Sequence, residues 1–264
     1  MNPLHIGSDI WQHRYLLSQL VKRDVLLRYR GAALGTLWVL LSPLFMLATF
    51  AYVFGQIFQS RWPQQGTDLP LWVFLYTGLI TFNVFSEAVS RSPISVRSYP
   101  SFVKKIVFPV HILPIVPLGA SVVHGVVNFF ILAAALAWEG TFRAQLFLLP
   151  VLMVPVVALA LGLSWFLAAW GVFLKDMTQI VPMFLQMLLF LSPVFYPLSA
   201  VPEALKTAYH YNPLAITIEL SRAAVTGQLI DWVAWLLAFS LGLIVLALGY
   251  AFFRHSQAEF VDAL

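Results

Sequence analysis

The stretch VKRDVLLRYRGAALGTLWVLLSPLFMLATFAYVFGQ, residues 21–56, joins a basic segment directly to a long apolar one. The basic part places four cations within the nine residues 22–30. The apolar part, residues 36–58, contains no Asp, Glu, Lys, Arg or His, and it exceeds the roughly 20 residues that a helix needs to cross a bilayer. The stretch therefore predicts a membrane-spanning helix preceded by a cationic segment at one membrane surface.

The composition of the whole chain agrees with this interpretation. Of 264 residues, 61% are hydrophobic and 10% are charged, and the mean hydropathy is +0.86, whereas a soluble domain carries about 25% charged residues. We therefore expect an integral membrane protein. The absence of cysteine excludes disulfides and cysteine-based metal sites or nucleophiles. Nucleic acid is not an expected partner, because most of the cations flank apolar segments, where membrane topology places them.

The apolar segments predict an all-α fold. A segment at residues 9–30 is amphipathic with a cationic end, which is typical of a helix lying in the membrane interface. Residues 199–229 contain apolar pieces too short to span, so we expect short re-entrant helices there, between the fifth and sixth spans. Six segments are expected to be transmembrane helices: 36–58, 71–89, 110–138, 144–174, 180–198 and 230–253.

The cations are divided unequally between the two sides that six spans would create. With both ends of the chain placed in the cytoplasm, eleven Lys and Arg residues fall in cytoplasmic segments. Four fall in outer segments: Arg61, Arg143, Lys206 and Arg222. Cytoplasmic loops of membrane proteins carry an excess of Lys and Arg. We therefore expect a multi-pass protein with both termini cytoplasmic.

Polar and aromatic side chains of the first predicted span share one helical face. They follow the spacing i, i+4, i+7, i+11, i+14 and i+18, and they are Trp38, Ser42, Phe45, Thr49, Tyr52 and Gln56. Two interpretations are open: a polar seam between packed helices, or the wall of a conduit. We favour the conduit, because the second and fifth spans carry similar residues at Asn83, Gln186 and Phe190.

Two polar groups inside other predicted spans are given structural interpretations. Glu87 lies in the second span, where a charge is costly unless it is paired or near the interface. Arg91 follows one turn later, so we expect a local ion pair between the two. His124 and Asn128 in the third span are also one turn apart, and we expect them to form hydrogen bonds rather than a metal site.

Three groups of motifs are more specific than the hydropathy and charge patterns that membrane proteins share. The first is RD-x3-RYR-x3-LG-x2-W at residues 23–38, followed by SPL at 42–44, and the second is VKKIVFP-x2-ILP at residues 103–114. The third combines FLKD at 173–176, SPVFYP at 192–197 and YNPL at 211–214. In this order and spacing the motifs resemble the permease subunit of ATP-binding-cassette (ABC) polysaccharide exporters, which export capsular polysaccharide, O-antigen or teichoic acid.

The resemblance covers nearly the whole chain and implies a transport subunit rather than an enzyme. It implies a homodimer in the bacterial inner membrane, working with two copies of a separate P-loop ATPase that holds the ATP and Mg. This chain has no G-x-x-x-x-G-K-[ST] motif, in agreement with a partner that binds the nucleotide, and no cofactor or metal is expected in it. The substrate would be a lipid-linked polysaccharide, with capsule or O-antigen favoured, and periplasmic export components would be further partners.

Two other classes of protein remain as alternatives. A polytopic glycosyltransferase or lipid-modifying enzyme would need carboxylates or a metal motif near the interface, and the chain has no D-x-D sequence. A secondary carrier would usually show more charges inside the membrane.

The same resemblance implies roles for particular residues. Arg28 and Arg30, on the interface helix, would contact the phosphate of the lipid carrier. Residues 91–109 would form the cytoplasmic coupling helix, with the ATPase contacted by Arg97, Tyr99, Phe102, Lys104, Lys105 and Phe108. An outer gate would be formed by Phe195, Tyr196, Pro197, Tyr211, Asn212 and Pro213.

Overall fold

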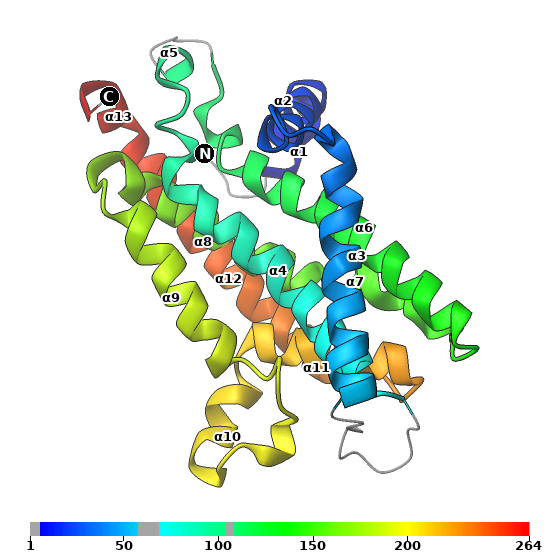
Figure 1. Ribbon diagram of the computed structural model, residues 1–264. Helices are drawn as coiled ribbons and strands as arrows, with labels where there is room; N and C mark the ends of the chain where they lie inside the picture. The colour runs from blue at the N-terminus through cyan, green and yellow to red at the C-terminus, as the bar shows by residue number, and fades with distance from the viewer. Residues whose placement is uncertain (1–5, 58–68, 104–107, 264) are drawn as a thin grey trace.

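The computed structural model describes residues 6–57, 69–103 and 108–263, and every regular element in them is helical (Figure 1). The α-helices are α1 (Ile6–Gln12), α2 (Arg14–Arg28), α3 (Trp38–Phe50), α4 (Leu71–Ser95), α5 (Pro100–Val103), α6 (Ile115–Trp138), α7 (Leu149–Leu152), α8 (Val154–Phe173), α9 (Met177–Leu191), α10 (Glu203–His210), α11 (Pro213–Thr226), α12 (Trp232–Ser256) and α13 (Phe260–Ala263). Short 3-10 turns lie at Gly35–Leu37, Val110–Ile112, Ala144–Leu148, Leu198–Ala200 and Gln257–Glu259, and a π-helical segment, η3, covers Ala51–Ile57.

Five helical segments of the described chain are long and apolar enough to cross a membrane, and they match the predicted first, second, third, fourth and sixth spans. They are Gly35–Ile57, Leu71–Ser95, Val110–Trp138, Ala144–Phe173 and Trp232–Glu259. The predicted bounds of the fifth span, 180–198, are wrong. Helix α9 has 15 residues and ends at Leu191, and Ser192 is extended with ψ of 150°, because the proline that follows it disfavours the helical conformation.

Helix α4 is the centre of the bundle. It packs against α6, α8, α9 and α11, and most of its side chains are buried. The helix continues through Pro93 to Ser95, past the predicted end at residue 89. The segment predicted to couple to an ATPase, 91–109, therefore begins inside α4.

Glycines let α4, α8 and α12 approach closely. A Cβ at Gly171 of α8 would overlap the carbonyl of Pro93 in α4, and a Cβ at Gly249 of α12 would overlap the carbonyl of Gly162 in α8. Helices in membranes pack by van der Waals contact, which small residues at the interface allow. These three helices therefore form one closely packed unit.

The predicted interface helix at 9–30 is two helices, α1 and α2, separated at His13. Helix α2 packs on α6, where Leu20 is 5% exposed and Val21 lies against Gly119. Figure 1 shows α1, α2, α5 and α13 at one end of the molecule and α10 at the other, with α9 running between the two ends. We call these the α2 end and the α10 end.

Candidate functional site

Two ion pairs hold α2 against α4 at the α2 end. Arg91 donates from Nη1 to Asp24 Oδ2 at 2.5 Å and from Nη2 to Asp24 Oδ1 at 2.7 Å, a bidentate pair. Arg28 donates from Nη2 to Glu87 Oε1 at 2.6 Å. The predicted local pair between Glu87 and Arg91 is therefore wrong. Because α2 packs on α6 beside α4, each of these α4 side chains reaches a partner on α2 instead of one turn away on its own helix.

His124 of α6 joins the second pair. Its Nδ1 lies 2.9 and 3.0 Å from the two carboxylate oxygens of Glu87 and 3.0 Å from Arg28 Nη1. Partial burial alone would lower the pKa of Arg28, but the hydrogen bond and charge of Glu87 raise that pKa above its ordinary value. Arg28 is thus fully cationic, and in this structure its guanidinium is engaged by a carboxylate of the chain itself.

The polar network continues from His124 towards the middle of the bundle. Asn128 donates from Nδ2 to the backbone carbonyl of His124 at 2.8 Å, and Tyr76 of α4 donates its hydroxyl to Asn128 Oδ1 at 2.8 Å. The predicted hydrogen bonding of His124 and Asn128 is confirmed. The network connects α2, α4 and α6 side chain by side chain.

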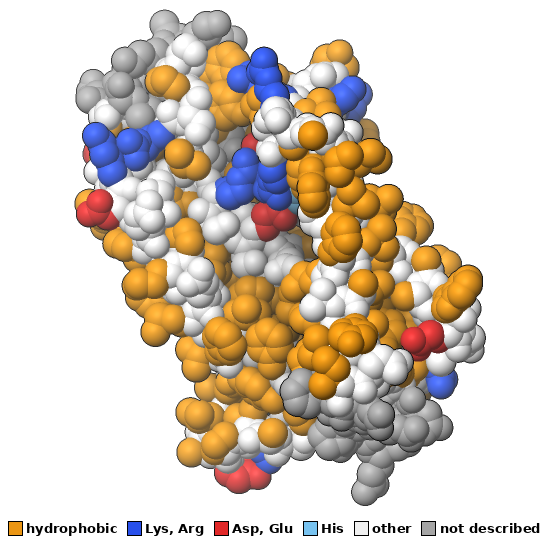
Figure 2. All heavy atoms as spheres, viewed as in Figure 1, with side chains coloured by type: hydrophobic (Ala, Val, Ile, Leu, Met, Phe, Trp, Pro, Cys, Tyr) orange, Lys and Arg blue, Asp and Glu red, His pale blue; other side chains and the backbone are white. Residues whose placement is uncertain are grey.

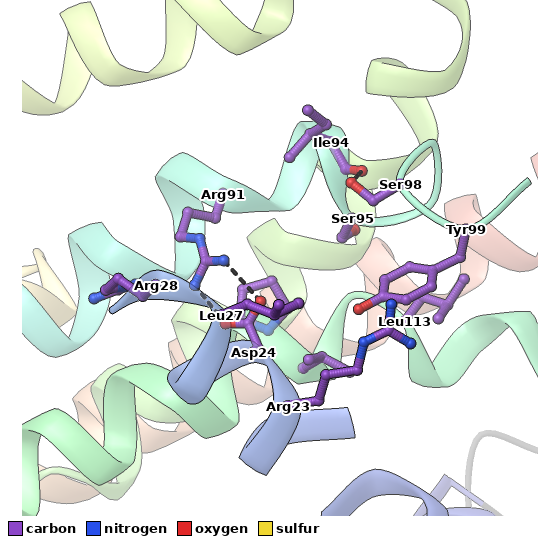
Figure 3. A pocket seen from close by; sticks show the side chains of 12 residues that line it. Arg23, Asp24, Leu27, Arg28, Arg91, Ile94, Ser95, Ser98, Tyr99 and Leu113 are labelled. Atoms are coloured by element: carbon purple, nitrogen blue, oxygen red, sulfur yellow. Dashed lines mark hydrogen bonds and ion pairs between the residues drawn. The ribbon is translucent and has the colours of Figure 1, made fainter. Parts of the chain in front are cut away.

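Three pockets surround the end of α2, and cations line each of them. One of about 460 Å³, drawn in Figure 3, is lined by Arg23, Arg28 and Arg91 with Asp24 and Tyr99. A second of about 550 Å³ lies between α2 and the start of the first span. A third of about 260 Å³ lies between α2, α3, α4 and α6 and contains Arg28 again. Figure 2 shows basic side chains gathered beside acidic ones at a hollow of this face.

The second pocket is the most strongly basic of the three. Its lining includes Lys22, Arg23 and Arg30 and no acidic residue. Arg30, predicted to contact the carrier phosphate, is exposed here, while Arg28 lines the other two pockets. The two predicted phosphate contacts therefore lie on different sides of the end of α2, and Lys22 and Arg23 join them as further cations.

The aromatic residues of the predicted coupling segment stack on one another. Phe102 lies between Tyr99, with ring centroids 5.7 Å apart, and Phe108, with centroids 4.8 Å apart. The guanidinium of Arg23 lies 5.7 Å from the centroid of the Tyr99 ring, which is within the range of a cation–π contact. Partial burial raises the pKa of Tyr99. The coupling segment thus touches α2 as well as continuing α4.

The predicted coupling set also contains three charged residues, and the structure describes only one of them. Arg97 is half-buried just after the end of α4. Lys104 and Lys105 lie outside the described residues.

The predicted face of the first span is turned away from the other described helices. Trp38 is half-buried, whereas Ser42, Phe45, Thr49, Tyr52 and Gln56 are exposed, Phe45 by 61% and Tyr52 by 63%. Packing among the described helices of one chain therefore does not account for this stripe. The last part of the span is π-helical, a rare conformation that is frequent at functional sites.

The conduit residues of the other two spans are also exposed, but only one joins the stripe. Asn83 and Ser42 line the same 260 Å³ pocket. Gln186 and Phe190 are exposed on α9, which lies on the opposite side of α4 from α3 in Figure 1. A single chain therefore brings together the first and second spans of the predicted wall and leaves the fifth apart from them.

At the α10 end, two tyrosines tie α10 to the end of α9. The hydroxyls of Tyr196 and Tyr209 lie 2.8 Å apart, and Tyr209 donates to the carbonyl of Leu191 at 2.6 Å. Phe195 lies with its ring centroid 5.7 Å from that of Phe190. Two of the predicted gate residues, Phe195 and Tyr196, thus lie in two separate aromatic pairs, with Phe190 and Tyr209 respectively.

The other predicted gate residues are placed differently. Asn212 caps α11, since its side chain accepts a hydrogen bond from the Leu214 backbone N–H at 3.0 Å, and Pro213 is the first residue of that helix, where proline is favoured. Tyr211 is 59% exposed and Pro197 is buried. Asn212 and Pro213 therefore define where α11 begins.

Sequence reasoning missed Arg222, which it counted only among the outer cations. The residue is 3% exposed and donates to the backbone carbonyl of Val194 at 2.7 Å. It also donates to the Phe74 carbonyl at 3.3 Å and pairs with Glu219 at 2.6 Å. Arg222 thus binds the loop after α9 to α4 and α11. The available signal was a cation inside the apolar run 214–225.

These features define a polytopic helical membrane protein with basic pockets at its α2 end. Within the described part of the chain, no three His, Asp or Glu side chains are grouped as metal ligands would be. The chain belongs to the ABC-2 type transporter family, whose sequence model matches residues 15–226.

Curated relatives agree with this assignment. The chain is 28% identical over 203 residues to an O-antigen export system permease protein of Myxococcus xanthus, covering 76% of this chain and 75% of that one. It is 22% identical over 251 residues to an O-antigen export system permease protein of Klebsiella pneumoniae, covering 94% and 95%. It is 28% identical over 243 residues to a polysialic acid transport protein of Escherichia coli, covering 90% and 92%.

Proposed function

We propose that this chain is the permease subunit of an ATP-driven exporter that moves a lipid-linked polysaccharide, capsule or O-antigen, across the bacterial inner membrane. The observation that carries the proposal is the family match over most of the chain, joined by relatives named for O-antigen export and polysialic acid transport. The basic pockets around α2 support it, because they suit a phosphate-bearing lipid at a membrane surface. Family membership favours transport over the glycosyltransferase and secondary-carrier alternatives.

The proposal is tested by deleting the gene and analysing surface and cell-associated glycan. We expect the surface polysaccharide to disappear while its lipid-linked form accumulates inside the cell, because synthesis continues without export. Inactivating the ATP site of the partner ATPase is expected to give the same phenotype. Normal surface glycan in the deletion strain would contradict the proposal.

In the proposed assembly the chain forms a homodimer with two ATPase subunits, and ATP and Mg bind only to those partners. The segment 91–109 receives the movement of the ATPase through the stacked rings of Tyr99, Phe102 and Phe108, with Arg97 and the lysines at 104 and 105 as charged contacts. Because this segment continues α4, ATPase closure displaces the central helix of the bundle.

The proposed topology has six spans, with α9 and the loop after it as the fifth, and both termini in the cytoplasm. The α2 end is then cytoplasmic and the α10 end periplasmic. The short α9 is accommodated by neighbouring helices or a local thinning of the bilayer. Additional periplasmic export components would meet the α10 end.

This topology can be tested cleanly, because the natural chain contains no cysteine. We expect single cysteines at the exposed positions Ser199 and Thr207 to react with a membrane-impermeant maleimide in cells whose outer membrane alone has been permeabilised. Cysteines at the exposed Ser98 and His255 should react only after the inner membrane is opened. The reverse pattern, or labelling of only one member of each pair, would contradict the orientation or the number of spans.

The proposed conduit is lined by the exposed stripe of the first span with Asn83, and by Gln186 and Phe190 on α9. Aromatic faces contact the C–H surfaces of sugars, so the wall needs few sequence-specific hydrogen bonds. In a homodimer, α9 of one copy and α3 of the other can face a common space, which one chain alone does not provide. Phe195, Tyr196 and Tyr211 form the outer gate.

Replacing Phe45 or Tyr52 with alanine is expected to lower export about tenfold, because each removes a flat contact surface from the conduit wall. Both side chains are exposed in the single chain, so we expect no loss of assembly with the ATPase in co-purification. Leu40→Ala, at a position that is also exposed on the first span but lies outside the stripe, is the control. Intact export combined with failed assembly would make the stripe a packing seam between subunits instead.

A further inference from the structure

The two ion pairs at the α2 end differ in the number of hydrogen bonds that join their partners. Asp24 and Arg91 engage both carboxylate oxygens and both terminal nitrogens, so this pair is saturated. Arg28 gives only Nη2 to one oxygen of Glu87, and its Nη1 lies against His124 instead. The first pair is an anchor, whereas the second is held by a single hydrogen bond.

His124 cannot satisfy both of its neighbours at once. If Nδ1 carries a proton, it donates to Glu87 and faces the guanidinium of Arg28, which can only donate. If Nδ1 carries no proton, it accepts from Arg28 and faces a carboxylate that can only accept. The cluster therefore has two hydrogen-bond patterns. When Nδ1 is protonated, Glu87 has a donor in His124 besides Arg28, so its carboxylate stays hydrogen-bonded if Arg28 turns to another anion.

Arg28 also faces a space that an anion can enter. The 460 Å³ pocket is lined by three cations, Arg23, Arg28 and Arg91, and by one carboxylate, Asp24, which Arg91 neutralises. Arg23 therefore remains as a positive charge for a ligand, and Arg28 becomes the second one when it is released from Glu87. Figure 3 shows the Arg28 side chain extending away from the Asp24–Arg91 pair, and 30% of it is exposed.

We propose that the carboxylate of Glu87 binds Arg28 where the substrate's phosphate would bind. When that phosphate enters the pocket, it replaces the carboxylate on Arg28, and Glu87 stays hydrogen-bonded to His124. This inference rests on the proposed function, since the competing anion is the phosphate of the lipid-linked glycan. Glu87 is then a positioning residue. It keeps Arg28 in place and makes binding competitive, so that the anionic headgroups of ordinary phospholipids, which are abundant at this surface, do not fill the site permanently.

The test measures binding of farnesyl phosphate, a short polyprenyl phosphate, to the purified full-length protein in phosphatidylcholine nanodiscs, followed by tryptophan fluorescence. We expect Glu87→Gln to bind about fivefold more tightly than the unaltered protein, because a partly exposed competing ion pair is removed. Arg28→Gln should bind about tenfold more weakly, as loss of a charge-assisted contact implies. The double variant should match Arg28→Gln, since Glu87 acts through Arg28.

Glu203→Gln is the control, because it removes a carboxylate that pairs with Lys206 at the α10 end and leaves the pockets around α2 unchanged. We expect no gain in affinity from it. Glu87→Asp draws the carboxylate back but keeps its charge, and it serves as the test if the Gln variant does not fold. It should bind about twofold more tightly than the unaltered protein, a smaller gain because the single hydrogen bond is weakened and not lost. A merely structural role for Glu87 predicts weaker binding in both Glu87 variants, so the sign of the change decides.

Unchanged or weaker binding by the folded Glu87 variants would overturn the inference, as would an equal gain in Glu203→Gln. If farnesol binds as tightly as farnesyl phosphate, the site does not recognise the phosphate. Inorganic phosphate binding as tightly would assign the site to a free anion instead of a lipid. The proposed function is judged separately by export in cells, so an exporting strain with unaltered affinity in Glu87→Gln refutes this inference alone.

Discussion

Replacing Arg222 with leucine is expected to abolish export and to destabilise the folded protein by about 3–5 kcal/mol, the usual effect of removing one partner from a buried ion pair. The side chain of Arg222 is 4% exposed and that of Glu219 is 24% exposed. The leucine variant leaves this carboxylate without its cation and removes the donor from the Val194 carbonyl. The loop that follows α9 and carries the aromatic residues of the proposed outer gate then loses its attachment to α4 and α11.

The measurements are the thermal melting of the purified protein and the amount of surface glycan. Lys206→Leu is a matched control, because Lys206 also pairs with a glutamate three residues earlier, but at side-chain exposures of 42% and 87%. Such an exposed pair contributes about 0–1 kcal/mol, so this control should melt and export normally. Arg222→Lys should be intermediate, since an ammonium lacks the planar fork that reaches several acceptors. A normal melting temperature in Arg222→Leu would contradict the anchoring role.

The sequence was sufficient to locate most of the fold, because long apolar segments can satisfy their backbone in lipid only as helices. The spans found between Gly35 and Ile57 and between Val110 and Trp138 agree with the predicted 36–58 and 110–138. The predicted fifth span, 180–198, extends past the end of helix α9 at Leu191. There hydropathy remains high through Phe195, whereas Pro193 forces the preceding residue out of the helix.

The site was less predictable, because its partners depend on how helices cross. Glu87 and Arg91 are one turn apart, and spacing alone favours pairing them. Helix α2 overrides that preference, because its packing on α6 brings Asp24 and Arg28 within reach of α4. A pattern within one helix carries no information about how that helix packs against another. For the same reason Arg222 was counted only as a cation of an outer loop, although its side chain is buried in contacts between helices.

Removing the other anchor, in Arg91→Gln, is expected to release α2 from α4. The bidentate pair with Asp24 is lost, and Asp24, whose side chain is 14% exposed, keeps a charge without its partner. Because the Arg91 side chain is 35% exposed, we expect a cost of about 1–3 kcal/mol, less than for a fully buried pair. Limited trypsin digestion should then cut at Lys22 or Arg23 about tenfold faster than in the unaltered protein.

The exchange variant Asp24→Arg with Arg91→Asp restores an ion pair of opposite polarity, and it should recover most of the protection. Equal cutting in Arg91→Gln and the unaltered protein would mean that apolar packing of Leu20 and Val21 on α6 holds α2 by itself. Arg91 lies in the last turns of α4, next to the segment proposed to receive the ATPase. Its ion pair therefore connects that segment to α2 and the basic pockets. We expect Arg91→Gln to lose export while retaining the ATPase in co-purification, because the mechanical connection is broken and the docking surface is intact.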